Sequence, residues 1–139
     1  MLLSPRKTKY RKQQKKKPFK SVYGSSYMFA GLNHGVIGLK ALEPGRLKSK
    51  QIQSVRNVIN KKIKKIGRLK VNVFPHIPIT KKPIEVRMGK GKGNVDHWVF
   101  NVKAGFMLYE IETNSMPAAI KALELGQRRI PFKTRIIFD

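Results

Sequence analysis

Two stretches of the chain carry the spacing of apolar residues that an amphipathic helix requires. In the first, isoleucine and valine recur every three or four residues and therefore fall on one helical face: Ile52, Val55, Ile59, Ile63 and Ile66. Ser49 before this run and Gly67 after it predict a helix over residues 49–66 whose apolar face is buried. A second, alanine-rich helix is predicted over residues 115–127, because Pro117 suits the first helical turn.

Alternating apolar and polar residues predict several strands. They are expected near residues 26–32, 36–42 and 69–74, in a hairpin over residues 98–111, and at residues 132–138. Gly105 is expected to form the turn of the hairpin. One face of the first hairpin strand should carry Trp98, Phe100, Val102 and Ala104, and one face of the last strand Phe132, Thr134, Ile136 and Phe138. These elements predict an α+β fold, with two helices packed on a largely antiparallel β-sheet.

The length of 139 residues fits one domain preceded by a charged segment. Residues 1–20 are expected to form an extended basic N-terminal arm, since they hold nine lysines and arginines and no acidic residue. Such a run repels itself until phosphate groups neutralise it, although a merely solubilising tail would have the same composition. Residues 21–139 are expected to form the single α+β domain.

The charge of the chain indicates a polyanionic partner. There are 31 lysines and arginines against 7 acidic residues, which gives a formal net charge of +24. A protein this basic repels itself unless a nucleic acid or an anionic membrane neutralises it. No apolar run is long enough to cross a bilayer, and the first residues lack the apolar stretch of a secretion signal. The absence of cysteine excludes disulfides and thiolate zinc sites.

A glycine–lysine loop, residues 86–94, is the most distinctive segment of the sequence. It follows a connection that Pro78 and Pro83 should keep extended, and it alternates three glycines with two lysines. Glycine lets the backbone approach a phosphate closely, so the segment is expected to contact anions, although a flexible loop with incidental lysines is the alternative. The segment is not a nucleotide P-loop, because Asn94 and a strand follow it where that motif needs a helix.

Residues for catalysis or metal binding are sparse. The acidic residues are scattered, and only Glu110 and Glu112 share a strand face, where they could balance nearby lysines. Asp96 and His97 are adjacent in a strand, which predicts side chains on opposite faces and no catalytic triad. The histidines lack metal-ligand spacing: His34, His76 and His97. We therefore expect no enzyme, metal or cofactor, and shape and phosphate recognition of folded RNA in preference to stacking on single strands.

An ordered set of short motifs resembles one known family. The motifs are Thr8-Lys9-Tyr10-Arg11-Lys12, Gly38-Leu39-Lys40-Ala41, Gly45-Arg46-Leu47, Val73-Phe74-Pro75, the unbroken Val86 to Asn94 string, Trp98-Val99 and Leu108-Tyr109-Glu110. Together they resemble the bacterial and organellar large-subunit ribosomal protein L-sixteen family over nearly the whole chain. The resemblance implies an α+β fold beside the transfer-RNA cleft and a glycine–lysine loop that reaches toward the peptidyl transferase region.

Charge and resemblance together nominate the residues that contact RNA. They are Arg6, Lys7, Lys9, Arg11, Lys12, Lys15, Lys16, Lys17, Lys40, Arg46, Arg56, Lys62, Lys82, Arg87, Met88, Gly89, Lys90, Gly91, Lys92 and Gly93. The expected partners are large-subunit ribosomal RNA, transfer RNA in the ribosomal cleft and neighbouring large-subunit proteins, with no membrane and no small-molecule substrate. A free-standing basic architectural protein and a phosphate-loop transferase that uses Asp96 for magnesium are the competing hypotheses.

The amino-acid composition indicates the kind of genome that encodes the protein, and with it the compartment in which the protein is made. Lysine outnumbers arginine 22 to 9, and isoleucine and asparagine are frequent, as an A/T-rich genome would produce. With a family-like start at residue 1, this favours a mitochondrial ribosome, while a plastid and the cytoplasm of an A/T-rich bacterium stay open.

Overall fold

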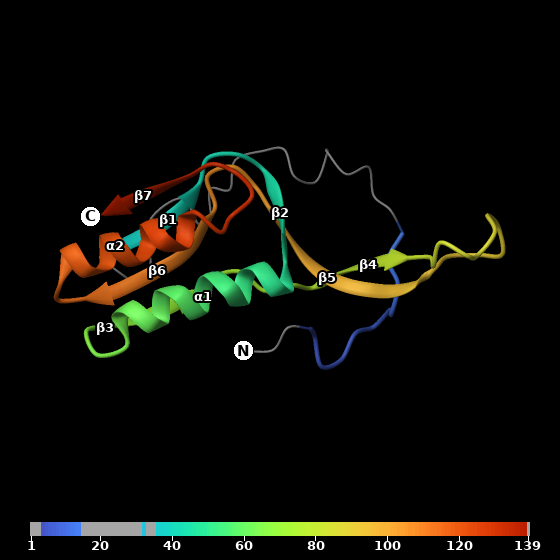
Figure 1. Cartoon of the computed structure of the whole chain (residues 1–139), viewed down its shortest axis with the longest axis horizontal. Helices are drawn as coiled ribbons and strands as arrows, with labels where there is room; N and C mark the ends of the chain where they lie inside the picture. The colour runs from blue at the N-terminus through green and yellow to red at the C-terminus, as the bar shows by residue number, and fades with distance from the viewer. Residues whose placement is uncertain (1–3, 15–31, 33–35, 139) are drawn as a thin grey trace.

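The computed structural model describes residues 4–14, 32 and 36–138 of the chain. The elements in chain order are β1 (Ile37–Ala41), β2 (Gly45–Lys48), α1 (Ser49–Ile63), β3 (Gly67–Val71), β4 (Ile77–Lys81), β5 (Asn94–Val102), β6 (Met107–Thr113), α2 (Met116–Gln127) and β7 (Thr134–Phe138). The predicted α+β fold is confirmed, and both predicted helices are present (Figure 1).

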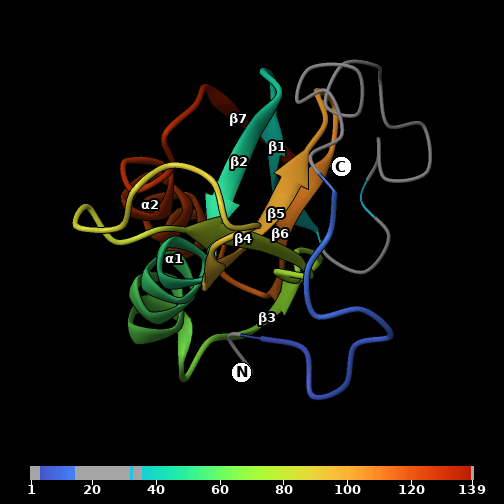
Figure 2. The same ribbon diagram turned by 90° about the vertical axis from the view of Figure 1, so that its right-hand side faces the viewer.

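The strands divide into two antiparallel sheets. The order in the four-stranded sheet is β3-β6-β1-β7, and in the three-stranded sheet it is β2-β5-β4. Both helices lie on one side of the four-stranded sheet (Figure 2), while β4 and β5 extend away from it as a long ribbon (Figure 1). The helices and the first sheet therefore form the packed body of the domain, and the ribbon carries chain away from it.

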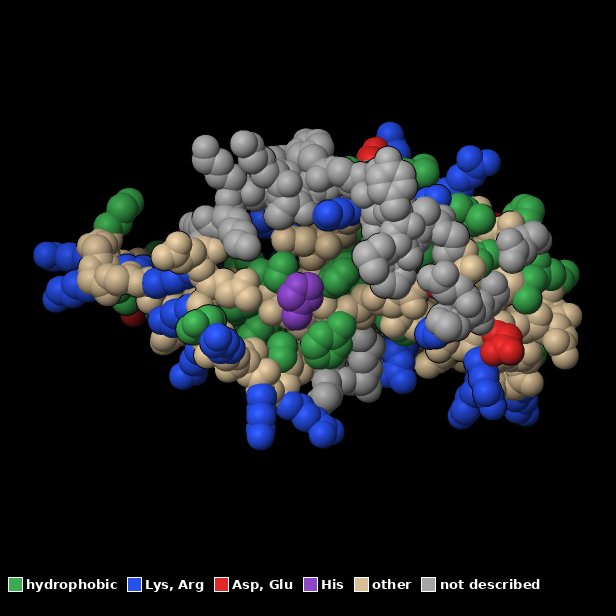
Figure 3. Space-filling view, turned by 180° about the vertical axis from the view of Figure 1, so that it is seen from behind, with side chains coloured by type: hydrophobic (Ala, Val, Ile, Leu, Met, Phe, Trp, Pro, Cys, Tyr) green, Lys and Arg blue, Asp and Glu red, His purple; other side chains and the backbone are tan. Residues whose placement is uncertain are grey.

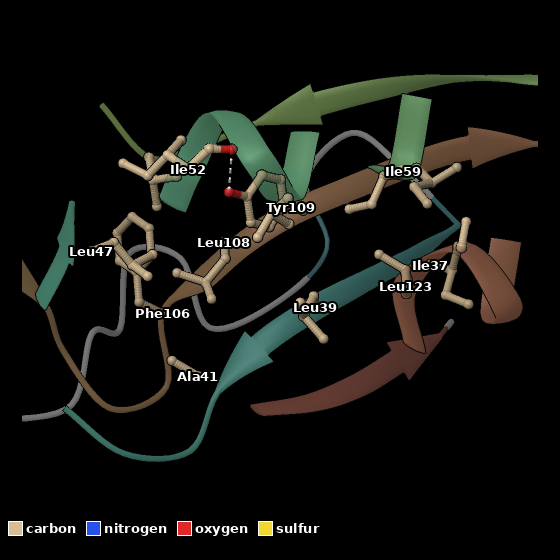
Figure 4. Packing of buried hydrophobic residues seen from close by; sticks show 14 of the residues in the cluster. Ile37, Leu39, Ala41, Leu47, Ile52, Ile59, Phe106, Leu108, Tyr109 and Leu123 are labelled. Carbon is tan, nitrogen blue, oxygen red and sulfur yellow. Dashed lines mark hydrogen bonds between the residues drawn. The ribbon is translucent and has the colours of Figure 1, made fainter. Parts of the chain in front are cut away.

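The apolar stripe of α1 is buried between α2 and the four-stranded sheet. Ile52, Val55, Ile59 and Ile63 are all buried, as predicted, and they pack with residues from α2 and the strands (Figure 4). The helices approach closely at Gly126, where an added β-carbon would lie 3.0 Å from the Ile59 Cδ1 atom. Close-packed interiors of this kind tolerate little change in side-chain volume.

The Tyr109 hydroxyl fixes the start of α1 to β6. It donates a hydrogen bond of 3.2 Å to the Ile52 carbonyl oxygen, and the ring is fully buried (Figure 4). Burial raises the pKa of Tyr109, so the hydroxyl keeps its proton as a hydrogen-bond donor at neutral pH.

The helix boundaries differ from the prediction at both ends. Lys48 is the N-cap, where its backbone N–H donates to the Gln51 side chain at 2.9 Å, and Ser49 is the first helical residue. The helix ends at Ile63, and a turn follows in which the Ile66 N–H donates to the Ile63 carbonyl at 2.8 Å. Ile66 is therefore 43% exposed, and its assignment to the buried face was wrong.

The predicted hairpin over residues 98–111 was also wrong. Gly105 does turn the chain, with a φ of +83°, but β5 and β6 join different sheets and do not pair. The cause is Ala41: its carbonyl accepts from the Gly105 N–H at 2.8 Å, and its N–H donates to the Phe106 carbonyl at 2.9 Å. This exchange directs the chain after the turn onto β1 instead of back along β5.

Two observed strands had no predicted residue range, and the bounds of others differ from the predicted ones. β2 is only four residues long, and β4 contains Pro78, so neither produces a clear alternation. β3 begins at Gly67, which the sequence assigned to the helix stop, while β1 and β7 agree closely with prediction. The strand expected at residues 26–32 lies outside the described residues except for residue 32, which is not in a strand.

The predicted strand faces are partly correct. In β5, Trp98 and Phe100 are half-buried and Val102 is buried, but Val99 on the other side is also only 3% exposed, because β5 is covered on both faces. In β7, Phe138 is 61% exposed, as expected for the end of an edge strand.

The revised end of α1 can be tested with one substitution at two sites. Ile59→Asp should prevent folding, because an unpaired buried carboxylate costs several kcal/mol against a typical total stability of about 5–15 kcal/mol. Ile66→Asp makes the same chemical change at the exposed position and should melt within a few degrees of the wild type. Thermal melts followed by circular dichroism measure both. Equal loss of structure in the two variants would contradict the helix end at Ile63.

Candidate nucleic-acid interface

The glycine–lysine loop projects beyond the free end of the β4–β5 ribbon (Figure 1). Its backbone is left-handed at three successive residues, with φ of +96° at Gly89, +50° at Lys90 and +81° at Gly91. A β-carbon added at Gly89 or Gly91 would meet nothing within 4 Å. These glycines therefore serve the turn and access to the backbone, and they make no close packing contact.

Gly93 has a different role from the other loop glycines. A β-carbon there would lie 2.7 Å from the carbonyl oxygen of Lys81, the last residue of β4. Asn94, which follows, is already the first residue of β5 and pairs with Lys81. Gly93 is thus required where the ribbon closes.

Apolar and cationic side chains of the loop both point into solvent. Met88 and, just before the loop, Ile84 are fully exposed and Val86 is about half exposed, at 101%, 99% and 52%. Arg87 and Lys90 between and after them are also exposed. Exposed apolar side chains set among cations mark a contact surface for a partner that carries both negative charge and apolar area. Nucleic acid has both, in its phosphates and its bases.

The described part of the basic arm, residues 4–14, meets this loop. The Lys12 ammonium donates to the Lys92 carbonyl oxygen at 3.1 Å, and the Lys92 ammonium donates to the carbonyl oxygen of Gln13. Lys82, which directly follows β4, donates from its ammonium to the Gly89 carbonyl oxygen of the loop. Lysine side chains of each segment thus donate hydrogen bonds to backbone carbonyl oxygens of the other, and the two segments lie about 80 residues apart in the chain. The arm and the loop form one cationic surface.

The hydrogen bonds just described, between the arm and the loop and between Lys82 and the loop, involve none of the other predicted RNA-contacting residues. Lys40 is half-buried in β1, Arg46 is exposed on β2, Arg56 is half-buried on α1 and Lys62 is exposed near its end. The remaining arm cations that the structure describes are exposed: Arg6, Lys7, Lys9 and Arg11. Lys15, Lys16 and Lys17 lie outside the described residues. Figure 3 shows lysines and arginines spread over the face seen from behind, with few acidic side chains.

One contact was missed in the sequence. Lys12 and Gln13 connect the arm to the loop, because the backbone carbonyls of Lys92 and Gln13 accept hydrogen bonds from lysine ammonium groups. No pattern in the sequence could have indicated this, because every residue offers a backbone carbonyl.

The prediction that Asp96 and His97 point apart was wrong. The His97 Nδ1–H donates to the Asp96 carboxylate at 2.7 Å. The register of β4 and β5 shifts at this point, with Ile79 opposite His97 and Thr80 opposite Val95, so Asp96 is the extra residue of a β-bulge. Bulges re-aim side chains, which explains why neighbours in one strand can meet. Among the described residues no group of three or more His, Asp or Glu could hold a metal ion.

The acidic pair in β6 lies opposite basic residues of β3. Glu112 is the register partner of Arg68, and Glu110 is the partner of Lys70. The Glu110 side chain is buried and accepts a hydrogen bond of 2.5 Å from the Asn72 amide. The register places both acids opposite cations, and charge balance between them stays a prediction.

Comparison with known proteins now identifies the family. The model of the family described as ribosomal protein L16p/L10e matches residues 5–137. The chain belongs to this family. The large ribosomal subunit protein uL16 of Chelativorans sp. (strain BNC1) is 44% identical over 136 residues, which cover 98% of this chain and 96% of that protein.

Membership of the L16p/L10e family confirms the resemblance seen in the motifs, and the match includes both the arm from residue 5 and the entire glycine–lysine loop. Neither α1 nor α2, in the described part of the chain, has the length and apolar content needed to cross a lipid bilayer.

Deletion of the arm is expected to weaken RNA binding while leaving folding intact. A chain lacking residues 1–14 should melt at nearly the wild-type temperature, because none of the described residues of this segment, 4–14, belongs to the hydrophobic core. Its affinity for ribosomal RNA should fall, and the dependence of affinity on salt should weaken, since at least five cations are lost with it. Differential scanning calorimetry and filter binding measure the two effects. Unchanged binding would show that the arm is only a solubilising tail.

The Asp96–His97 contact predicts a shifted titration. The pKa of the Asp96 carboxyl lies below its ordinary value, mainly because His97 donates a hydrogen bond to it; the charges of His97, Lys81 and Lys48 act in the same direction, and slight burial opposes them. His97→Ala should raise the pKa of Asp96, and Lys48→Ala should raise it less, as carbon-detected NMR would measure. Because the pKa of Asp96 is lower in the folded state than in the unfolded state, the contact stabilises the folded protein at pH values above the ordinary carboxyl pKa. This stabilisation is lost as the pH falls through the folded-state pKa. An unchanged titration in His97→Ala would contradict the contact.

Proposed function

We propose that this protein is a structural constituent of the large ribosomal subunit that binds large-subunit ribosomal RNA near the peptidyl transferase region and helps to position transfer RNA. The observation that carries the proposal is the glycine–lysine loop, held out from the domain on a two-stranded ribbon with its cations and backbone exposed. Family membership supports the ribosomal role, since the relative described above is named as a protein of the large subunit.

The loop is suited to folded RNA by its backbone as well as its charge. The chain turns through left-handed residues from Gly89 to Gly91, and the two glycines carry no side chain, so their backbone N–H groups can approach phosphate oxygens. Arg87 and Lys90 add charge-assisted contacts, and the exposed Met88 side chain adds apolar contact with sugars or bases. This combination recognises shape and phosphate positions more than base sequence.

A structural role fits the chemistry of the loop better than a phosphoryl-transfer role. The loop runs directly into β5, whereas a nucleotide-binding P-loop runs into a helix whose N-terminus helps to bind phosphate. Asp96, the residue that the transferase hypothesis needs for magnesium, is hydrogen-bonded to His97. A free-standing DNA-binding role has no comparable support in the family to which the chain belongs.

The partners that follow from this proposal are ribosomal RNA, transfer RNA in the cleft and neighbouring large-subunit proteins. The organelle is a separate matter. The mitochondrial origin inferred from the excess of lysine over arginine stays a prediction, and the relative named above is bacterial.

Substitutions in the loop should impair translation without loss of assembly. Gly91→Val forces a β-branched residue into a left-handed conformation but meets no neighbouring atom, so the domain should fold normally. Lys90→Ala with Lys92→Ala removes charge from the same surface. Purified ribosomes with either change should sediment normally but bind transfer RNA and form peptide bonds several-fold more slowly than wild type.

The control for this test removes equal charge elsewhere. Lys50→Ala with Lys103→Ala changes two exposed lysines on α1 and on the turn after β5. These ribosomes should work at the wild-type rate. Normal rates in fully assembled loop variants would mean that the loop is only a spacer, and failure of the wild-type protein to join the large subunit would refute the proposed function itself.

A further inference from the structure

A second cationic surface lies at the opposite end of the domain from the loop. A groove of about 700 Å³ runs between the C-terminal half of α1 and the start of β3. Its polar lining consists of Asn57, Asn60, Lys61, Lys64 and Arg68. We call this feature the α1–β3 groove. In the sequence, Lys61, Lys62, Lys64 and Lys65 cluster at the end of this helix, where they are expected to form either a solvent face or a phosphate-binding face. The structure places Lys61 and Lys64 of this set in the groove and adds Arg68 to them.

The spacing of these side chains explains how α1 builds the groove. Asn57, Lys61 and the C-cap residue Lys64 recur at intervals of four and three residues, so they continue one polar stripe beside the buried apolar stripe of α1. The chain then turns into β3 and brings Arg68 to the other wall. Three positive charges and two amides, all able to donate hydrogen bonds, therefore line the open α1–β3 groove.

A neighbouring cleft shows that this composition is specific to the groove. The cleft between α1 and α2 is lined by Lys62 and Lys121 but also by Glu124, so a carboxylate offsets its positive charge. Among the described residues that line the α1–β3 groove there is no acidic side chain. Glu112 lies opposite Arg68 in the sheet and balances at most one of the three charges.

The groove suits a chain of phosphates. Ammonium, guanidinium and amide groups donate hydrogen bonds to phosphate oxygens, and three cations at the wall can follow several phosphates in a row. Leu69 is the one large apolar side chain in the lining, and no aromatic side chain is present among the lining residues for base stacking. The recognition is therefore of a backbone, independent of sequence.

The position of the groove determines which RNA it can reach. The turn from α1 into β3 and the glycine–lysine loop lie at opposite ends of the long axis of the molecule, with the packed domain between them (Figure 1). An RNA segment bound at the glycine–lysine loop therefore does not also lie in the α1–β3 groove. We propose that the α1–β3 groove binds the phosphate backbone of a second RNA segment, so that the protein bridges two segments of ribosomal RNA. This inference rests on the proposed function, which supplies the RNA.

The first experiment compares two double variants of the full chain that lose the same charge. Lys61→Ala with Lys64→Ala changes the groove, and Lys65→Ala with Lys121→Ala changes two exposed lysines outside it. Binding to a short RNA duplex of arbitrary sequence is measured at several salt concentrations. The affinity of the groove variant should depend less steeply on salt: the magnitude of the slope of log affinity against log salt should fall by about 2, one for each lost phosphate contact. The control should keep the wild-type slope. Equal slopes in the two variants would overturn the proposal, and circular dichroism checks that both are folded.

The second experiment tests bridging on the natural RNA. Large subunits assembled with wild-type protein, with the groove variant or with Lys90→Ala and Lys92→Ala are probed with hydroxyl radicals. The groove variant should lose protection at one set of nucleotides and the loop variant at another, without overlap. Loss of the same set in both would overturn bridging. Loss of an acidic neighbouring protein with all RNA protection kept would assign the groove to a protein partner and overturn it as well. Absence of any protection by the wild-type protein would instead refute the proposed function.

Discussion

Burial of the apolar stripe of α1 against α2 and the four-stranded sheet is the interaction on which the rest of the structure depends. With a net charge of +24, the chain is destabilised by its own repulsion, and only an apolar interior can offset that repulsion before RNA binds. Ile59 at the middle of the stripe meets Gly126, and Tyr109 ties the start of the helix to β6. Because these contacts use one face of α1, its lysines are left for the solvent and for RNA.

The packed body also determines where the loop can reach. β5 is nine residues long, and β4 pairs with its first two-thirds, from Asn94 to Val99, so the glycine–lysine loop is held at a distance on a ribbon. A ribbon restricts the position of the loop more than a free linker would, and the left-handed residues at its tip restrict its shape. The contact between Lys12 and Lys92 adds the arm to the same surface. A functional surface thus forms on segments that contribute little to the core.

The errors of sequence-based prediction have a common origin. The hairpin over residues 98–111 failed because Ala41, more than sixty positions away, captures the backbone after Gly105. The Asp96–His97 pair was assigned to opposite faces because a regular strand was assumed, whereas pairing with β4 introduces a bulge. Ile66 fits the helical period but lies beyond the last turn, since Gly67 is needed to start β3. In each case a distant strand competes with a local preference for the same backbone groups.

The sequence by itself determined the α+β class, both helices, the buried face of α1 and the identity of the loop. These depend on local spacing: apolar residues every three or four positions, glycines between lysines, and motifs that keep their order. Tertiary structure alone decided the division into two sheets, the meeting of arm and loop, and the convergence of Lys61, Lys64 and Arg68 on one groove. The physical reason is that strand pairing and lysine-to-carbonyl contacts use backbone groups that every residue carries, so only the folded chain determines which of them meet.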